Sequence, residues 1–271
     1  MIDKQQYKEQ GFLLLREFFD PSELDSVRRE AKQIFLIQLK ENALINSFEV
    51  TEEEFETGLY ALFERDFRQI IYCGKQAQHL LSLHRLSLNE KILDVLKQLD
   101  LEFPVINVRP TIFFNSPRLG KRDVDWKKPA HQDWRTTQGS LDSMIVWVPL
   151  IDIDRSLGAL EIAPESHKLG LLNYEFKNDY HVLADAAVAD LPFVSVEVAK
   201  GDALFFSTFL VHRSGNNTSG SIRWSCHFRY NNLLERTFVE RGFPHSYIYK
   251  PQDELITPGF PSARDVTKVF E

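Results

Sequence analysis

Cysteine is scarce in this chain of 271 residues, which contains only Cys73 and Cys226. Small secreted domains that depend on disulfides contain many more, so a disulfide framework is excluded as the basis of the fold. The first six residues, 1–6, lack the basic and then apolar pattern of a signal peptide. No apolar run approaches the ~20 residues that a membrane-spanning helix needs. We therefore expect a cytoplasmic protein with no membrane partner.

An excess of positive charge is also missing. The formal net charge is −7 and the pI is about 5.7, and no basic stripe is interleaved with aromatic residues. Proteins that bind nucleic acids carry such an electrostatic footprint, so we expect no nucleic-acid partner. The chain also lacks internal repeats and a Gly/Ser-rich linker, and its 43% hydrophobic content suits one globular domain over residues 1–271. Nothing in the composition indicates an oligomeric state.

Helix signals dominate the first 100 residues. An apolar run at 11–19 has the length of a strand, and Asp20-Pro21-Ser22-Glu23 follows it with an N-cap, a first-turn proline and an acidic third position. The patterns Thr51-Glu52-Glu53-Glu54 and Ser87-Leu88-Asn89-Glu90 are capping boxes of the same kind. They predict helices near 52–73 and 88–99.

Strand signals take over after residue 100. Short β-branched and aromatic runs, separated by turns such as Lys200-Gly201-Asp202, are typical of a sandwich or barrel. The predicted strands are 105–109, 111–114, 144–150, 160–163, 193–198, 203–206 and 222–230. We therefore predict a mainly β core at about 101–235 with the N-terminal helices on one outer face. The tail, 236–271, contains several prolines and should be irregular.

Three residues form a candidate metal site. His131 and Asp133 are two apart, so an extended backbone would direct both side chains to one face. His212 follows the predicted strand at 203–206 and is the best candidate for a third ligand. Two histidines and one carboxylate, with open positions opposite, are the ligand set of non-haem Fe(II) oxygenases.

A basic residue lies on the next predicted strand. Arg223 stands eleven residues after His212 in an apolar segment, where a guanidinium needs a carboxylate that it can bind with two parallel hydrogen bonds. Ser225, two residues on, shares its face and could add a hydrogen bond, although a solvent-facing serine is an equal alternative. His227 and Arg229 share this face too, so either could reach the pocket, although hydrogen-bonded polar groups of the core are the default interpretation.

These residues resemble, in order, the phytanoyl-CoA dioxygenase (PhyH) family over most of the chain. The motifs are His131-Gln132-Asp133, Trp147-Val148-Pro149-Leu150, Gly158-Ala159-Leu160-Glu161, Lys200-Gly201-Asp202, His212 and Arg223. The resemblance implies an Fe(II)- and 2-oxoglutarate-dependent oxygenase on a double-stranded β-helix, a jelly-roll or cupin-like fold. It implies that Arg223 binds 2-oxoglutarate, that Trp147 lies beside it, and that O2 is the oxidant for hydroxylating a small molecule, with release of succinate and CO2.

Two other classes of function remain open. A zinc- or manganese-loaded β-barrel hydrolase or isomerase would use the same three ligands but leaves Arg223 unexplained. A non-catalytic binding protein on the same fold would be expected to have lost a ligand, and none of the three positions is lost.

The segment before His131 carries positive charge. Residues 116–129 contain Arg118, Lys121, Arg122, Lys127 and Lys128 against two aspartates, in a chain that is negative overall. We predict a lid that orders over an anionic substrate, with Trp126 covering the apolar part of that substrate. The alternative is a solvated loop whose charges keep it off the core.

Overall fold

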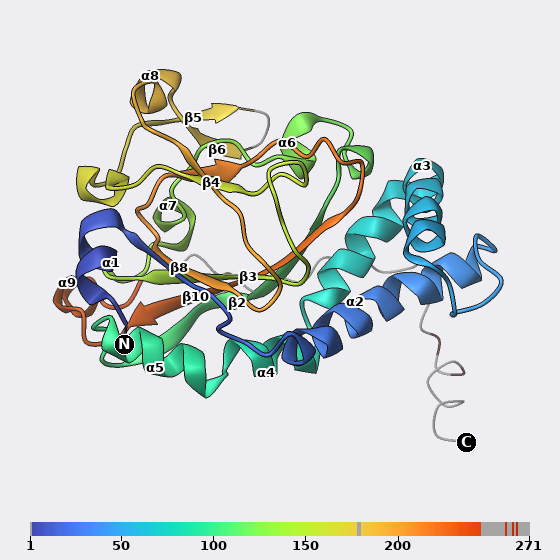
Figure 1. Ribbon diagram of the computed structural model, residues 1–271, viewed down its shortest axis with the longest axis horizontal. Coiled ribbons are helices and arrows are strands. Elements are labelled where there is room, and N and C mark those ends of the chain that lie inside the picture. The colour runs from blue at the N-terminus through green and yellow to red at the C-terminus, as the bar shows by residue number, and fades with distance from the viewer. Residues whose placement is uncertain (1, 178–179, 245–257, 259–261, 263, 265–271) are drawn as a thin grey trace.

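Two antiparallel sheets pack face to face in the computed structural model, which describes residues 2–177, 180–244, 258, 262 and 264 (Figure 1). The larger sheet contains, in spatial order, β1 (Phe12–Leu15), β8 (Ala203–Ser207), β3 (Met144–Pro149), β10 (Arg223–Asn232) and β2 (Pro104–Asn115). The smaller sheet contains β7 (Val194–Val196), β4 (Leu160–Ile162) and β9 (His212–Ser214). A separate hairpin joins β5 (Tyr174–Lys177) to β6 (Tyr180–Leu183). This jelly-roll arrangement confirms the predicted fold class.

The N-terminal helices cover the outer face of the larger sheet, as predicted (Figure 1). They are α1 (Lys4–Gln10), α2 (Pro21–Glu41), α3 (Glu52–Ala77), α4 (Leu81–Ser87) and α5 (Glu90–Gln98). The first two predicted capping boxes are present at the starts of α2 and α3. The third is wrong, because Ser87 ends α4 and donates its hydroxyl to the His84 carbonyl, while Asn89 caps α5.

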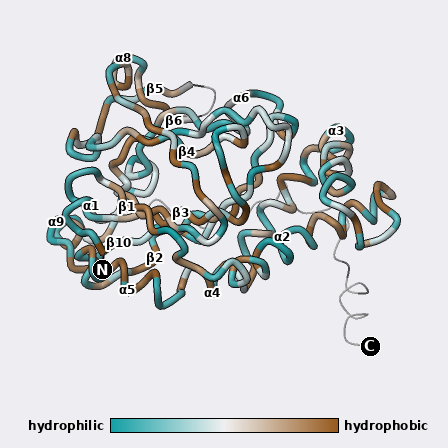
Figure 2. Tube along the Cα trace, viewed as in Figure 1, coloured by the Kyte–Doolittle hydropathy of each residue, from teal (hydrophilic) through white to brown (hydrophobic). Residues whose placement is uncertain are grey.

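Alternation along the central strands builds two cores. Met144, Val146 and Val148 of β3 pack toward the helices, whereas Ile145 and Trp147 pack toward the smaller sheet. Because both faces of β3 are covered, all six of its residues are buried and it is apolar throughout (Figure 2). The interior between the two sheets is where the candidate ligands lie.

Several elements differ from the sequence prediction. The runs at 105–109 and 111–114 form one strand, β2, which tolerates Pro110 because it lies at the edge of the sheet and needs no second hydrogen-bonded partner. The predicted strand at 11–19 shrinks to β1, and α1, α4 and β9 were not predicted. In the predicted irregular tail, α9 (Arg236–Glu240) is helical, and most of the remainder lies outside the described residues.

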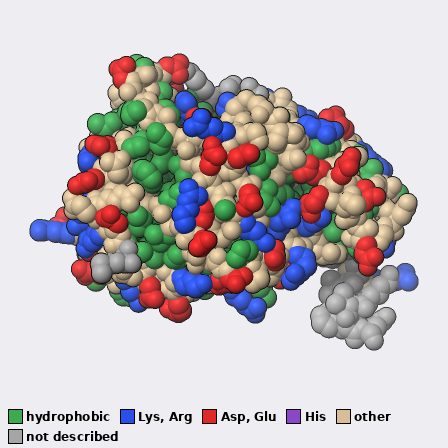
Figure 3. All heavy atoms as spheres, viewed as in Figure 1, with side chains coloured by type: hydrophobic (Ala, Val, Ile, Leu, Met, Phe, Trp, Pro, Cys, Tyr) green, Lys and Arg blue, Asp and Glu red, His purple; other side chains and the backbone are tan. Residues whose placement is uncertain are grey.

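Short helices occupy the connections. They are η1 (Pro117–Leu119), α6 (Asp123–Trp126), α7 (Trp134–Thr137), η2 (Ser166–Leu169) and α8 (Asp185–Val188). Basic and acidic side chains are interspersed on the face shown in Figure 3. Within the described part of the chain, no helix is long and apolar enough to cross a membrane.

Candidate metal centre

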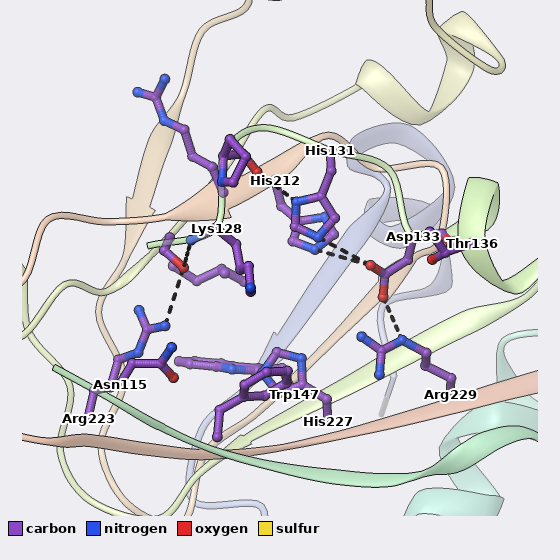
Figure 4. Close-up of a pocket in the computed structure, with 15 residues that line it drawn as sticks. Asn115, Lys128, His131, Asp133, Thr136, Trp147, His212, Arg223, His227 and Arg229 are labelled. Atoms are coloured by element: carbon purple, nitrogen blue, oxygen red, sulfur yellow. Dashed lines mark hydrogen bonds and ion pairs between the residues drawn. The ribbon is translucent and has the colours of Figure 1, made fainter. Parts of the chain in front are cut away.

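The three predicted ligands meet at one end of the inter-sheet space (Figure 4). His131 forms an isolated antiparallel bridge with His212, the first residue of β9, and each backbone N–H donates to the other carbonyl. The Nε2 atoms of His131 and His212 lie 3.2 and 3.9 Å from Asp133 Oδ1. One donor atom from each of the three residues falls within 4.8 Å of the others, so they could hold one metal ion.

The backbone that carries the triad is only partly extended. Asp133 adopts helical angles (φ −65°, ψ −30°) and directly precedes α7, and its carbonyl accepts hydrogen bonds from the hydroxyls of Thr136 and Thr137 in that helix. The extended backbone considered for this stretch therefore does not reach Asp133, although the two side chains still converge. Gln132 points away and is buried, donating to the Gly170 and Phe209 carbonyls, which fixes this turn.

Hydrogen bonds set the tautomer of both histidines. Nδ1 of His131 lies 2.8 Å from the Pro129 carbonyl, and Nδ1 of His212 lies 3.0 Å from the Leu210 carbonyl. A carbonyl only accepts, so each Nδ1 must carry the proton and each Nε2 lone pair faces Asp133. Burial, with His131 nearby, lowers the pKa of His212 to about 3, so its imidazole is neutral and ready to ligate at physiological pH.

Asp133 is kept ionised by a neighbouring arginine. Burial alone would raise the pKa of this carboxyl, but the Arg229 guanidinium outweighs that effect, and the pKa lies well below its usual range. Arg229 Nε donates to Asp133 Oδ2 at 2.6 Å, while Oδ1 faces the histidines. Two imidazoles that can ligate through Nε2 and one ionised carboxylate fit Fe(II).

Arg223 is a buried cation without a carboxylate partner among the described residues. Its side chain donates to the Gly158 carbonyl and, at 3.4 Å, to the Ser214 hydroxyl, while its buried Nε has no partner in the described chain. Burial lowers its pKa to about 10, which still leaves it charged at neutral pH. A site that buries an unpaired guanidinium is suited to bind an anion.

A cavity of about 310 Å³ connects Arg223 with the triad. Figure 4 shows Trp147 and His227 between Arg223 and Arg229. The triad lies across the cavity from Trp147 and His227. Its walls are Phe113, Asn115, Lys128, Pro129, His131, Asp133, Thr136, Trp147, Leu160, His212, Arg213, Ser214, Arg223, His227 and Arg229. Ser225 is fully buried beside His227, at 3.5 Å between Oγ and Nε2, and is not part of the wall.

The side chains predicted to form a lid lie elsewhere. The Arg118 guanidinium stacks over the Tyr60 ring at 3.7 Å, and Lys121 Nζ lies 3.7 Å from the centre of the Phe67 ring, both on α3. Arg122 pairs with Asp125, with Nη2 and Oδ1 3.2 Å apart. Trp126 is buried and accepts a hydrogen bond from Asn115 at its carbonyl.

A second cavity, of about 740 Å³, lies between α3, β2 and this segment. Lys121 and Arg122 line it, whereas none of Arg118, Lys121, Arg122 and Trp126 lines the cavity of the triad. The only basic residue of the segment that reaches the triad cavity is Lys128.

The fold and the triad together define a jelly-roll protein with two histidines and one carboxylate that could hold a metal ion. The sequence model of the phytanoyl-CoA dioxygenase (PhyH) family matches residues 7–225. The chain therefore belongs to this family.

Individual relatives are distant. The chain is 26% identical to the probable phytanoyl-CoA dioxygenase of Caenorhabditis elegans over 255 residues, which covers 86% of this chain and 76% of the relative. It is 25% identical to the peroxisomal phytanoyl-CoA dioxygenase of Mus musculus over 235 residues, which covers 82% of this chain and 66% of the relative.

Solved structures share the fold at lower identity. The non-haem monooxygenase ThoJ, in its apo form, has a TM-score of 0.58 at 19% identity, covering 84% of this chain and 76% of its own. The epimerase SnoN, in complex with Fe3+, alpha ketoglutarate and nogalamycin RO, has a TM-score of 0.55 at 16% identity, covering 84% and 82%. Family membership supports an oxygenase, and the solved structures show that the fold is shared.

Proposed function

We propose that this protein is an Fe(II)- and 2-oxoglutarate-dependent dioxygenase that hydroxylates a small molecule. The observation that carries the proposal is the buried Arg223, which has no carboxylate of the described chain to pair with and shares a cavity with the triad. A dicarboxylate between the metal and Arg223 would supply that partner. Family membership supports the same reading.

Each residue of the cavity would have a role that follows from its position. His131, Asp133 and His212 would hold the iron, which with 2-oxoglutarate and O2 supplies the oxidising chemistry and yields succinate and CO2. Arg223 would bind the distal carboxylate of 2-oxoglutarate, and Trp147 would bound its site on one side. Phe113, Trp147 and Leu160 line the cavity with apolar surface, which limits the water that can reach the reacting groups.

A zinc- or manganese-loaded hydrolase or isomerase would use the same three ligands. It would give Arg223 no role, although burying this unpaired guanidinium lowers the stability of the protein. A non-catalytic binding protein would not need the complete ligand set with both tautomers fixed by hydrogen bonds. Both alternatives therefore explain fewer of the contacts around the cavity.

Two measurements test the proposal. Anaerobic addition of Fe(II) and then 2-oxoglutarate should produce a weak visible charge-transfer band, and Zn(II) in place of Fe(II) should produce none. Admission of O2 should then release succinate, faster when a metabolite panel contains the substrate. Absence of both the band and succinate in the iron-loaded protein would overturn the proposed function.

A further inference from the structure

Arg229 uses only one of its five N–H donors within the described chain. Nε donates to Asp133 Oδ2, and neither terminal nitrogen, Nη1 or Nη2, has a hydrogen-bond partner among the described residues. The side chain is 13% exposed, and it lines the cavity. Four N–H donors of a partly buried guanidinium therefore face a space where a ligand could accept them.

The charges around this cavity are unbalanced. Its walls carry Lys128, Arg213, Arg223 and Arg229 but one carboxylate, Asp133, among the described residues. Arg213 is already paired, with its Nε 2.5 Å from Glu161 Oε2. A metal ion on the triad would add further positive charge. One dicarboxylate at Arg223 would still leave a positive cavity, which favours a second anion.

The two guanidiniums lie at separate places in the cavity. Figure 4 shows Arg223 on the side of Asn115 and Arg229 on the side of Asp133 and Thr136, with Trp147 and His227 between them. Burial lowers the pKa of His227 well below its usual range, with Arg229 nearby, so this ring is neutral. A ligand at Arg229 would thus lie next to the metal without occupying the place of a ligand at Arg223.

We propose that Arg229 anchors a carboxylate of the substrate through its two terminal nitrogens, directly beside the metal. The inference rests on the proposed function, since it assigns a second anion to the same cavity. A planar carboxylate matches the fork of Nη1 and Nη2, and the apolar walls at Phe113 and Leu160 suit the rest of an organic acid. This places the anionic group inside the cavity and not at the predicted lid, where Arg118 and Lys121 stack on α3.

The test compares carboxylic acids with their primary amides. Straight-chain acids of graded length and the matched amides are titrated by calorimetry, under nitrogen, into protein loaded with Fe(II) and 2-oxoglutarate. The parent should bind the best acid about ten- to a hundredfold more tightly than its amide. Arg229→Gln should reduce that ratio to about one, and Arg229→Lys should retain part of it.

Matched measurements separate anchoring from the positioning of Asp133. Arg213→Gln removes a wall arginine that already has a carboxylate partner, and it should keep the acid preference. If Arg229→Gln weakened acid and amide equally, or if the parent showed no acid preference, the proposal would be overturned. A loss of 2-oxoglutarate affinity in Arg229→Gln as large as in Arg223→Ala would overturn it too. The acid-to-amide ratio is also measured without 2-oxoglutarate. Anchoring by Arg229 can then be tested even if the protein binds no 2-oxoglutarate, so failure of this proposal and failure of the proposed function are distinguishable.

Discussion

Arg223 shows how a single residue can favour function over stability. Arg223 is 6% exposed, and its guanidinium has only a carbonyl and a distant hydroxyl as partners among the described residues. Removing a charge from water without an opposite charge is unfavourable, so the ligand-free protein is destabilised at this position. The lowered pKa expresses the same penalty, which is fully present at neutral pH and is relieved only as the pH rises past about 10.

Arg223→Met should therefore separate stability from cosubstrate binding. We expect the melting temperature of the ligand-free variant to equal or exceed that of the parent, because an apolar side chain replaces a buried charge. We expect its 2-oxoglutarate affinity to fall by roughly 2–5 kcal/mol, so 2-oxoglutarate should raise the melting temperature of the parent only. Differential scanning fluorimetry with and without 2-oxoglutarate measures both. An unchanged affinity would remove the assigned role of Arg223.

His212→Ala should lose the metal. The variant lacks one of the three ligands, so its affinity for Fe(II) should fall. The fall should exceed the roughly ten- to hundredfold loss of affinity that is typical when a residue that only supports a ligand is replaced. Anaerobic metal titration followed by desalting and metal analysis provides the measurement. His79→Ala, at an exposed position just after α3, is the matched control and should retain iron. Full iron occupancy in His212→Ala would contradict the triad.

At the scale of single residues, the sequence indicated which residues form the site better than it indicated which residues they contact. The order of His131, Asp133, His212 and Arg223 located the residues that the structure brings to one cavity. Alternation on β10 placed Arg229 on the same face, but nothing in the sequence could reveal its hydrogen bond to Asp133, which joins residues 96 apart. The contacts of Arg118 and Lys121 could not be predicted from the sequence, because their aromatic partners come from α3.

β10 is the element on which fold and site depend together. Trp224, Cys226 and Phe228 point toward the helices and belong to the larger core. Arg223 and Arg229, on the opposite face, line the cavity. A shift of the register by one residue would exchange these two sets, so pairing with both β2 and β3 fixes the site as well as the sheet.

Elements with strong local signals could be predicted, and short ones could not. The capping boxes of α2 and α3 marked their starts, because they satisfy backbone N–H groups locally. β9 has only three residues and exists through pairing with β4, so no local pattern indicates it. Both Ser87 and Asn89 are suitable N-cap residues for α5, and the sequence did not show that α4 would end at Ser87 and leave Asn89 as the cap.

Thr51→Ala tests the capping box of α3. The Thr51 hydroxyl accepts from the Glu54 N–H, and the Glu54 carboxylate accepts from the Thr51 N–H. Loss of this cap should lower the free energy of unfolding by about 1 kcal/mol, measured by denaturant titration. Thr57→Ala, at an exposed position inside the same helix, is the control and should change it little. An equal effect of both variants would contradict the cap.

The same cap should depend on pH. Hydrogen bonds from the backbone N–H and the hydroxyl of Thr51 lower the pKa of Glu54. The Glu54 carboxylate therefore stabilises the fold at pH values above the pKa that Glu54 has in the unfolded chain. That contribution is lost as the pH falls through the lowered folded pKa. The stability difference between the parent and Glu54→Gln should therefore narrow in acid and be full at neutral pH, and a difference independent of pH would contradict the assignment.

At the scale of the whole molecule, helices and larger sheet share one core. The Phe35 ring of α2 lies 4.7 Å from the Phe114 ring of β2 and 6.1 Å from the Trp224 ring of β10, between ring centres. One continuous cluster of buried residues runs from α2 through α5 into β3, β8 and β10. We infer that the helix-rich part and the β core fold as one domain.

Phe35→Ala tests this coupling. Phe35 is fully buried, so its loss should leave a cavity and lower the free energy of unfolding by roughly 3–5 kcal/mol. Trp126, Trp134 and Trp147 lie outside the core cluster shared with the helices, and only Trp224 belongs to it. Tryptophan fluorescence therefore reports chiefly the β core, whereas the far-ultraviolet circular dichroism reports chiefly the helices. Both signals should shift together along the denaturant axis, because neither layer can keep its buried face without the other. Ile37→Ala, at an exposed position on the same helix, should leave both transitions in place. If the helical signal of Phe35→Ala were lost at a lower denaturant concentration than the fluorescence signal, the two layers would be separate folding units, and the site between the sheets would not depend on the helices for its stability.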